Sequence, residues 1–268
     1  MVLTAIAIIS LIIALVVFFV CFKTITRIYW IPVVFSGSAL TLIFLWILPL
    51  IVASWFVDLK KPCRKSNKFF RFYYYCFIDG VLRLARIKIH VSGKEKLPNE
   101  QFLLVSNHKS YIDPAVAIWE LRKHRIGFVG AKELLYRFPV LKKLGHKSFC
   151  IPIDRQSARD GVRMTNEAAE IINSQAASIG IYPEGQRNLD GEKLLPFKNG
   201  AFKIAQKAKC PIVVAIIKNI EKVKKNFPFR RTHVYFDLVE VLEQKDMEGY
   251  STQEISDRIR LIFEKEIG

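Results

Sequence analysis

His108 and Asp113 form the first pair of residues in the sequence that could do chemistry. They stand in the segment Asn107-His108-Lys109-Ser110-Tyr111-Ile112-Asp113, which follows a short apolar run. A histidine titrates near neutral pH and can act as a general base, and a nearby carboxylate can orient its ring. A structural role for Asp113 is the alternative, because Asp113-Pro114 before an apolar stretch is typical of a capped helix start.

A second polar segment, Tyr182-Pro183-Glu184-Gly185-Gln186-Arg187, also follows an apolar run. Gly185 permits unusual backbone angles and the close approach of a ligand. Arg187 offers a planar guanidinium that suits a phosphate or a carboxylate. Taken alone, such a hexapeptide is more often a polar turn than a binding site.

Two further clusters combine bases with structural residues. One runs from Lys132-Glu133-Leu134 to Ile153-Asp154-Arg155, and the other covers residues 197–202. Lys132 and Arg155 could bind an anion, but a surface helix and a salt bridge of Asp154 with Arg155 are simpler explanations. Core packing and helix capping suffice to explain residues 197–202.

The elements that must position these segments follow from apolar runs of strand length that alternate with helical patterns. The expected strands cover residues 87–91, 102–106, 126–130, 149–153, 178–182, 212–217 and 233–239. The expected helices cover residues 114–123, 132–143, 157–173, 200–209 and 252–265. This alternation predicts an α/β fold with a largely parallel sheet flanked by helices. In such a sheet, sites gather in the loops that leave the carboxyl ends of the strands.

The distribution of charge divides the chain into two parts. The 268 residues contain 41 Lys and Arg against 24 Asp and Glu, a net charge of +17, yet residues 1–57 hold only Lys23 and Arg27. The apolar stretch 2–22 would reach about 30 Å as a helix, the thickness of a hydrocarbon core. A second apolar stretch covers residues 28–57, with Pro49 near its end as a possible kink. We therefore expect a membrane-anchoring helical hairpin over residues 1–57, and we exclude a disordered chain and a purely membrane-embedded channel.

Residues 58–86 are expected to form a basic-aromatic interfacial helix. Six bases lie between Lys60 and Arg71 with no acid among them, and aromatic residues fill most of positions 69–75. The positive-inside bias places the following domain, residues 87–268, on the cytoplasmic face of the membrane, with anionic lipids as partners. An amphipathic helix whose aromatic residues pack on the domain is the alternative.

The sequence also argues against a cysteine-stabilised scaffold and a nucleic-acid-binding protein. Five scattered cysteines without a C-x-x-C pair argue against a disulfide framework and a zinc ribbon. A pI of about 9.7 is compatible with nucleic-acid binding, but no nucleic-acid-binding module is present, and anionic lipid is the better partner for the bases.

Taken in order, the polar segments resemble the glycerolipid acyltransferase family over about residues 88–217. The family's N-H-x-x-x-x-D motif matches at Asn107, His108 and Asp113, and its P-E-G-x-R motif matches at Pro183, Glu184, Gly185 and Arg187. Its K-x-L-type element and its I-D-R element match at Lys132, Glu133, Leu134, Ile153, Asp154 and Arg155. Two positions depart from the pattern: Gln186 stands where Thr or Ser is usual, and Val214 stands where a second Pro is common.

The resemblance implies an enzyme of phospholipid biosynthesis. It would transfer an acyl group from acyl-CoA or acyl-carrier protein to the sn-2 hydroxyl of 1-acyl-glycerol 3-phosphate (lysophosphatidic acid), giving phosphatidic acid. His108, paired with Asp113, would remove the hydroxyl proton. The reaction would need no metal and no cofactor apart from the acyl donor.

The resemblance also implies residues for the acceptor. Arg187 would hold its phosphate, with Lys132 and Arg155 as weaker candidates, and Glu184 and Gly185 would line its site. Two alternatives stay open: an acyltransferase that acts on glycerol 3-phosphate or another lysophospholipid, and a non-catalytic polybasic membrane-binding protein.

Overall fold

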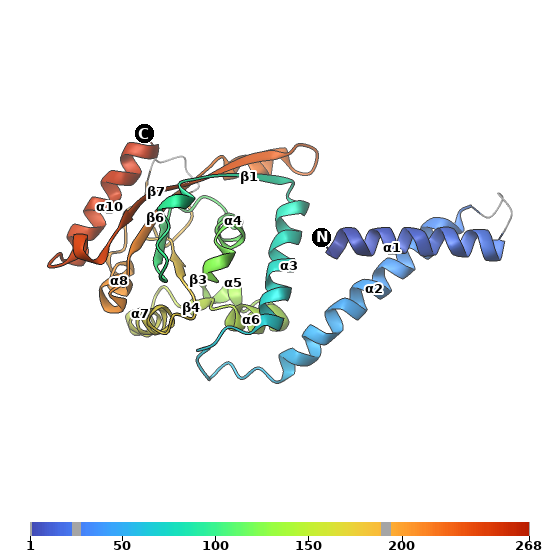
Figure 1. Cartoon of the computed structure of the whole chain (residues 1–268), viewed down its shortest axis with the longest axis horizontal. Helices are drawn as coiled ribbons and strands as arrows, with labels where there is room; N and C mark the ends of the chain where they lie inside the picture. The colour runs from blue at the N-terminus through green and yellow to red at the C-terminus, as the bar shows by residue number, and fades with distance from the viewer. Residues whose placement is uncertain (1, 23–27, 189–193, 268) are drawn as a thin grey trace. The chain divides into compact units, whose positions relative to one another are not determined.

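The computed structural model describes residues 2–22, 28–188 and 194–267, and it divides into two compact units, Met1–Asp58 and Leu59–Gly268 (Figure 1). The first unit consists of helix α1 (Val2–Val17), continued by a π-helical turn over Phe18–Phe22, and helix α2 (Trp30–Trp55), which packs against α1. Helix α2 runs through Pro49 without ending. The segments Val2–Cys21 and Trp30–Trp55 are each long and apolar enough to cross a membrane. The expected polar connection at residues 23–27 lies outside the described residues.

The second unit is built on a seven-stranded sheet with the order β1-β7-β6-β2-β5-β3-β4. The strands are β1 (Ile87–Ser92), β2 (Leu103–Ser106), β3 (Gly127–Ala131), β4 (Ile151–Ile153), β5 (Ile179–Ile181), β6 (Ile212–Lys218) and β7 (Thr232–Leu242). Every neighbouring pair is parallel except β6 and β7, so the predicted largely parallel α/β sheet is confirmed. The carboxyl ends of β6, β2, β5, β3 and β4 therefore share one edge, which we call the carboxyl edge.

Helices cover both faces of this sheet (Figure 1). The helices of this unit are α3 (Lys68–Leu84), α4 (Asp113–Glu120), α5 (Lys132–Leu135), α6 (Pro139–Lys147), α7 (Ala158–Asn173), α8 (Lys203–Ala208), α9 (Val223–Asn226) and α10 (Thr252–Ile267). Helices α7, α8 and α10 pack on one face and form the main core with alternate strand residues such as Leu103 and Val105. The intervening Leu104 is also fully buried. A strand buried on both faces explains the continuous apolar run of β2.

Helix α7 shows how the sequence produces these elements. Ser157 stands at the N-cap position, and its hydroxyl accepts a hydrogen bond from the backbone N–H of Asp160 at 3.2 Å. Met164, Ala168 and Ile171 recur at helical spacing and are buried in the core.

One predicted helix, residues 132–143, is wrong as a continuous element. The structure has two short helices there, and α6 begins at Pro139. Proline has no N–H for the helical ladder and disfavours helical angles in the preceding residue. Phe138 is accordingly extended, with φ −122° and ψ 125°.

The aromatic residues of α3 are divided between two environments. The side chain of Asn67 caps the helix by accepting from the backbone N–H groups of Phe69 and Phe70. Tyr74 is buried and its hydroxyl lies 3.3 Å from Cys150 Sγ. Phe72 is exposed. One face of α3 thus packs on the rest of the second unit, and the other face is exposed.

Candidate active site

A short loop between β2 and α4 holds His108 against Asp113. The Nδ1 atom of His108 lies 2.8 Å from Asp113 Oδ2. The same carboxylate oxygen accepts the backbone N–H groups of Lys109 at 2.7 Å and Ser110 at 2.8 Å. Asp113 is fully buried, and Ile112 occupies the N-cap position of α4. The alternative role of Asp113 as a side-chain cap is therefore wrong, because its carboxylate folds the loop and orients the imidazole.

The ring of Tyr182 covers one face of the His108 imidazole. The two ring centroids are 4.1 Å apart and the planes are inclined by 10°. Tyr182 directly follows β5, and Phe128 of β3 stacks on it in turn at 5.4 Å. When Nδ1 donates to Asp113, the ring nitrogen left to accept a proton is Nε2. Tyr182 received no role in the sequence analysis, because the contact requires β2 and β5 to be neighbours, which no local pattern reveals.

Asn107 joins the loop by hydrogen bonds to β6, the second strand that neighbours β2. Its Nδ2 donates to the carbonyl oxygen of Ile217 at 2.9 Å, and its Oδ1 accepts the N–H of Ile217 at 2.8 Å. This pair of bonds imitates a backbone ladder and extends the pairing of β2 with β6 beyond Ser106. These two hydrogen bonds to β6 therefore fix the backbone next to His108.

Glu184 joins the loop after β5 to the loop after β2. Its Oε1 accepts the N–H of His108 at 2.9 Å, and its Oε2 accepts the N–H of Leu195 at 3.2 Å. Burial raises the pKa of the Glu184 carboxyl, and the two hydrogen bonds from backbone N–H groups partly offset this effect. Both carboxylate oxygens serve the protein itself, so the geometry of Glu184 is that of a residue that positions the backbone of His108.

Gly185 and Arg187 lie further along the same loop. Gly185 has a φ of +68°, and a Cβ atom there would stand 2.8 Å from Cε of Lys198. Both the backbone angle and the close approach explain why glycine stands at this position. The guanidinium of Arg187 lies over the ring of Tyr111, with its Cζ 3.6 Å from the centroid. This stacking holds Arg187 next to the loop of His108 and leaves its N–H groups for an anion.

Lys132 and Arg155 follow β3 and β4, the last two strands of the carboxyl edge. The charge of Lys132 is among the causes that lower the pKa of Asp160, after the dominant hydrogen bond from Arg163. The chain folds so that the predicted site residues follow the order of the strands along this edge, from His108 to Arg155. Within the part of the chain that the structure describes, Lys132 forms no hydrogen bond or ion pair with His108 or Asp113, and it does not line the cavity beside Tyr182.

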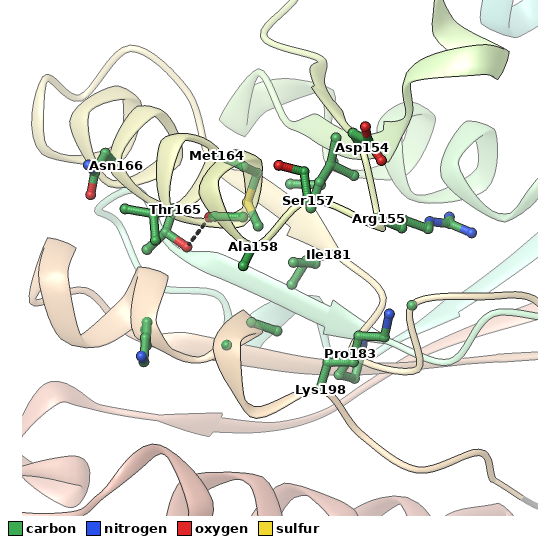
Figure 2. Close-up of a pocket in the computed structure, with 18 of the residues that line it drawn as sticks. Asp154, Arg155, Ser157, Ala158, Met164, Thr165, Asn166, Ile181, Pro183 and Lys198 are labelled. Carbon is green, nitrogen blue, oxygen red and sulfur yellow. Dashed lines mark hydrogen bonds between the residues drawn. The ribbon is translucent and has the colours of Figure 1, made fainter.

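A cavity of about 940 Å³ opens beside Tyr182, between α7 and the segment that leads into α8. Its apolar lining includes Val129, Ile153, Met164 and Ile181. Figure 2 shows Arg155 and Lys198 at one end of this cavity and Asn166 at the other. Gly185 lines it as well, so the loop that carries Glu184 borders both the cavity and the segment of His108.

The cavity has a cationic rim. Arg155, Lys198 and Lys203 line it and are exposed. None of the three forms an ion pair within the part of the chain that the structure describes. Between the described residues Asp154 and Arg155, the predicted salt bridge is not formed. Asp154 Oδ1 instead accepts a hydrogen bond from the N–H of Gln156 at 3.0 Å. An apolar lining with unpaired cations at one end suits an elongated, partly apolar anion.

The geometry defines an α/β domain with a buried His–Asp pair on the carboxyl edge of its sheet. Residues 88–218 match the family model named Acyltransferase, so this part of the chain is a domain of the acyltransferase family.

Named relatives and a solved structure agree with this assignment. The chain is 29% identical over 184 residues to the 1-acyl-sn-glycerol-3-phosphate acyltransferase of Limnanthes alba, covering 69% of this chain and 64% of the relative. It is 31% identical over 139 residues to the human 1-acyl-sn-glycerol-3-phosphate acyltransferase alpha, covering 52% and 48%. The chain therefore spans less than two thirds of the length of these relatives, and about half of the human protein.

A solved structure has the same fold. The 1-acyl-sn-glycerophosphate acyltransferase of Thermotoga maritima superposes with a TM-score of 0.56 at 20% sequence identity, covering 85% of this chain and 94% of that one. At this identity the likeness concerns the fold and carries no residue roles.

Proposed function

We propose that this chain transfers an acyl group from an acyl thioester to the sn-2 hydroxyl of 1-acyl-glycerol 3-phosphate, giving phosphatidic acid. The observation that carries the proposal is the His108–Asp113 pair, with its 2.8 Å contact, in an acyltransferase-family domain. The names of the relatives support the acceptor, since they are called 1-acyl-sn-glycerol-3-phosphate acyltransferases.

The proposed reaction is a direct transfer. His108 Nε2 takes the proton of the sn-2 hydroxyl while the hydroxyl oxygen attacks the thioester carbonyl carbon. The tetrahedral intermediate then collapses by breaking the carbon–sulfur bond, and the thiolate that leaves receives the proton from the imidazolium. Asp113 holds the ring and stabilises its positive charge during the step, as a buried carboxylate does in a catalytic triad. General-base catalysis of this kind contributes roughly 10²–10⁴-fold.

The two anionic substrates would be held by different cations. Arg187, stacked on Tyr111 beside the His108 loop, would bind the acceptor phosphate with its N–H groups. The cavity behind Tyr182 would receive the phosphopantetheine arm that CoA and acyl-carrier protein share, with its phosphate at Arg155 and Lys198. Glu184 would position the backbone of His108. This role differs from the expectation that Glu184 lines the acceptor site.

The membrane supplies the acceptor, and the two apolar helices would hold the domain there. We infer that the domain lies on the cytoplasmic face, because the six bases at residues 60–71 follow the second apolar helix directly. Acyl-CoA and acyl-carrier protein are available on that side.

The test is an acyl-transfer assay with the full chain in detergent, lysophosphatidate as acceptor, and acyl-CoA or acyl-carrier protein as donor. We expect turnover with at least one donor and loss of turnover in His108→Ala, with membrane attachment unchanged. His124→Ala is a matched control, because His124 follows α4 outside the site. Efficient acylation of glycerol 3-phosphate or another lysolipid with negligible use of lysophosphatidate would overturn the acceptor assignment. Unchanged function in His108→Ala would favour a non-catalytic membrane-binding protein.

A further inference from the structure

The loop between β6 and β7, residues 219–231, exposes two phenylalanines at its tip. Phe227 is 54% exposed and Phe229 is 85% exposed, and Pro228 between them is exposed too. Single exposed apolar residues are common on protein surfaces and need no explanation. Two phenylalanines on either side of an exposed proline concentrate apolar surface at one tip, and concentrated exposed apolar surface is a feature of binding sites for proteins or membranes.

Bases surround this apolar tip. The loop contains the exposed residues Lys222, Lys224, Lys225, Arg230 and Arg231. Glu221 is its one acidic residue. No ion pair joins these five bases to a carboxylate within the described part of the chain. We call residues 219–231 the aromatic-basic loop.

The aromatic-basic loop is a folded structure whose base is anchored in the domain. Ile220 and Val223 are buried at 1% and 6% exposure. The Nδ2 atom of Asn226 donates to Thr232 Oγ1 at 3.0 Å, and the N–H of Arg230 donates to the carbonyl oxygen of Asn226 at 2.8 Å. Ile220 and Val223 thus already pack on the domain. The loop has no further apolar side chain that could cover the two phenylalanines at its tip.

The topology of the sheet places this loop on the same edge as the candidate active site. Strand β6 pairs in parallel with β2, with Ala215 opposite Ser106. It ends at Lys218 on the carboxyl edge, and β7 returns from there in the antiparallel direction. His108 follows β2, the strand next to β6. The aromatic-basic loop and His108 therefore leave adjacent strands at one end of the sheet.

We propose that the aromatic-basic loop docks on an anionic lipid bilayer, with Phe227 and Phe229 entering the boundary between headgroups and acyl chains. Phenylalanine has no polar group to be satisfied, so it is suited to that boundary, and the flanking bases would contact lipid phosphates. An acidic protein partner would complement the bases but would not by itself explain two apolar rings at the tip. The docked loop would direct the carboxyl edge to the bilayer that holds the acceptor. This inference deepens the proposed function but is tested without measuring activity.

The test measures the depth of position 229 in the membrane. A nitroxide spin label is attached to Phe229→Cys in the full chain, in a background with Cys21→Ser and Cys76→Ser, reconstituted in vesicles. Accessibility to oxygen and to a water-soluble nickel complex then reports whether the label lies in lipid or in water. Lys209→Cys is the matched control, because Lys209 is exposed and lies before the amino end of β6, at the opposite end of the sheet. A sample without an introduced cysteine gives the background from the buried thiols.

We expect the label at position 229 to be oxygen-accessible and protected from nickel when one third of the lipid is phosphatidylglycerol, and the label at position 209 to remain accessible to nickel. Replacing Lys222, Lys224 and Lys225 by Gln should reduce this protection, since each base near an anionic surface contributes about fivefold to binding. Equal nickel accessibility at positions 229 and 209 would overturn the proposal. So would protection of position 229 only after acidic carrier protein is added, which would assign the loop to a protein partner. Because no outcome depends on turnover, a negative result here leaves the proposed acyl transfer to its own assay.

Discussion

At the residue scale, Asp113 orients the His108 imidazole and holds the backbone of the loop. A substitution of the same size can test these two roles without changing the packing. Its Oδ2 accepts hydrogen bonds from the imidazole and from two backbone N–H groups. Asp113→Asn keeps the shape and can keep an oxygen at the Oδ2 position, because its N–H₂ group can take the place of Oδ1, which has no hydrogen-bond partner among the described residues. The substitution therefore removes the negative charge beside the imidazole. We expect kcat to fall by about 10³-fold or more, as in triads that lose this carboxylate.

The measurement is kcat with saturating lysophosphatidate and donor, beside a thermal unfolding curve. Asp257→Asn, on the exposed surface of α10, is the control and should retain full activity. A variant Asp113→Asn that is folded and fully active would show that His108 needs no carboxylate and would contradict the proposed mechanism.

A substitution of Lys198 tests, also at the residue scale, whether the cavity binds the acyl donor. Its stem passes over Gly185 and its ammonium group has no ion pair within the described residues. Removing one charged contact to a phosphate costs about 1.5–3 kcal/mol, so Lys198→Ala should raise KM for the acyl donor about tenfold or more. The KM for lysophosphatidate should not change, because Arg187 is assigned to that phosphate. An increase in the acceptor KM alone would move the donor out of this cavity.

At the scale of elements, the sequence predicts strands and helices well but does not predict strand order. The strand patterns around residues 102–106 and 178–182 each locate a polar loop, yet only the parallel pairing of β2 with β5 brings Tyr182 and Glu184 to His108. The cavity also depends on the placement of α7 and α8, which no local pattern encodes. Pro139 marks a position in the sequence where a helix break is favoured, although α2 continues through Pro49.

The start of α7 offers a prediction about pH at this scale. Asp160 accepts hydrogen bonds from Arg163 Nε at 2.6 Å and from the N–H of Asp154 at 2.7 Å, which ties the helix to the end of β4. The hydrogen bond from Arg163 is the main cause that lowers the pKa of Asp160. A folded-state pKa below the unfolded value of about 3.9 means that ionised Asp160 stabilises the fold above that pH. This stabilisation is lost as the pH falls through the folded-state pKa.

We therefore expect Asp160→Asn to lower the free energy of unfolding by about 1 kcal/mol at neutral pH. The difference from the unchanged chain should shrink below about pH 4. Urea unfolding in detergent across this pH range measures it. Glu264→Gln, which breaks an exposed pair with Arg260, is the control and should change stability by less than about 0.5 kcal/mol. A difference that grows on acidification would contradict the assigned sign.

At the scale of the whole molecule, the net positive charge is concentrated in one part of the chain, where it could attract anionic partners. Residues 58–268 carry 39 of the 41 bases and all 24 acids, which leaves +15 on this part of the chain. A field of this sign would attract the proposed partners, anionic lipid and an acidic carrier protein, and would accelerate encounter with both. A soluble nucleic-acid-binding protein would have no use for two helices of membrane-spanning length, so the anchor and the charge together indicate an enzyme that works at a bilayer surface.

The orientation of the chain gives the last prediction. Two spans would return the chain to the side where it began, and the six bases of residues 60–71 favour the cytoplasm. In the background with Cys21→Ser and Cys76→Ser, a cysteine at exposed Lys209 should resist a membrane-impermeant maleimide in intact cells and react after permeabilisation. A cysteine at Thr24, in the connection between the two apolar helices, should react in intact cells if the hairpin spans. If the hairpin is embedded in one leaflet, neither position will react. Reaction of Lys209→Cys in intact cells would place the domain on the opposite face and, with it, out of reach of acyl-CoA.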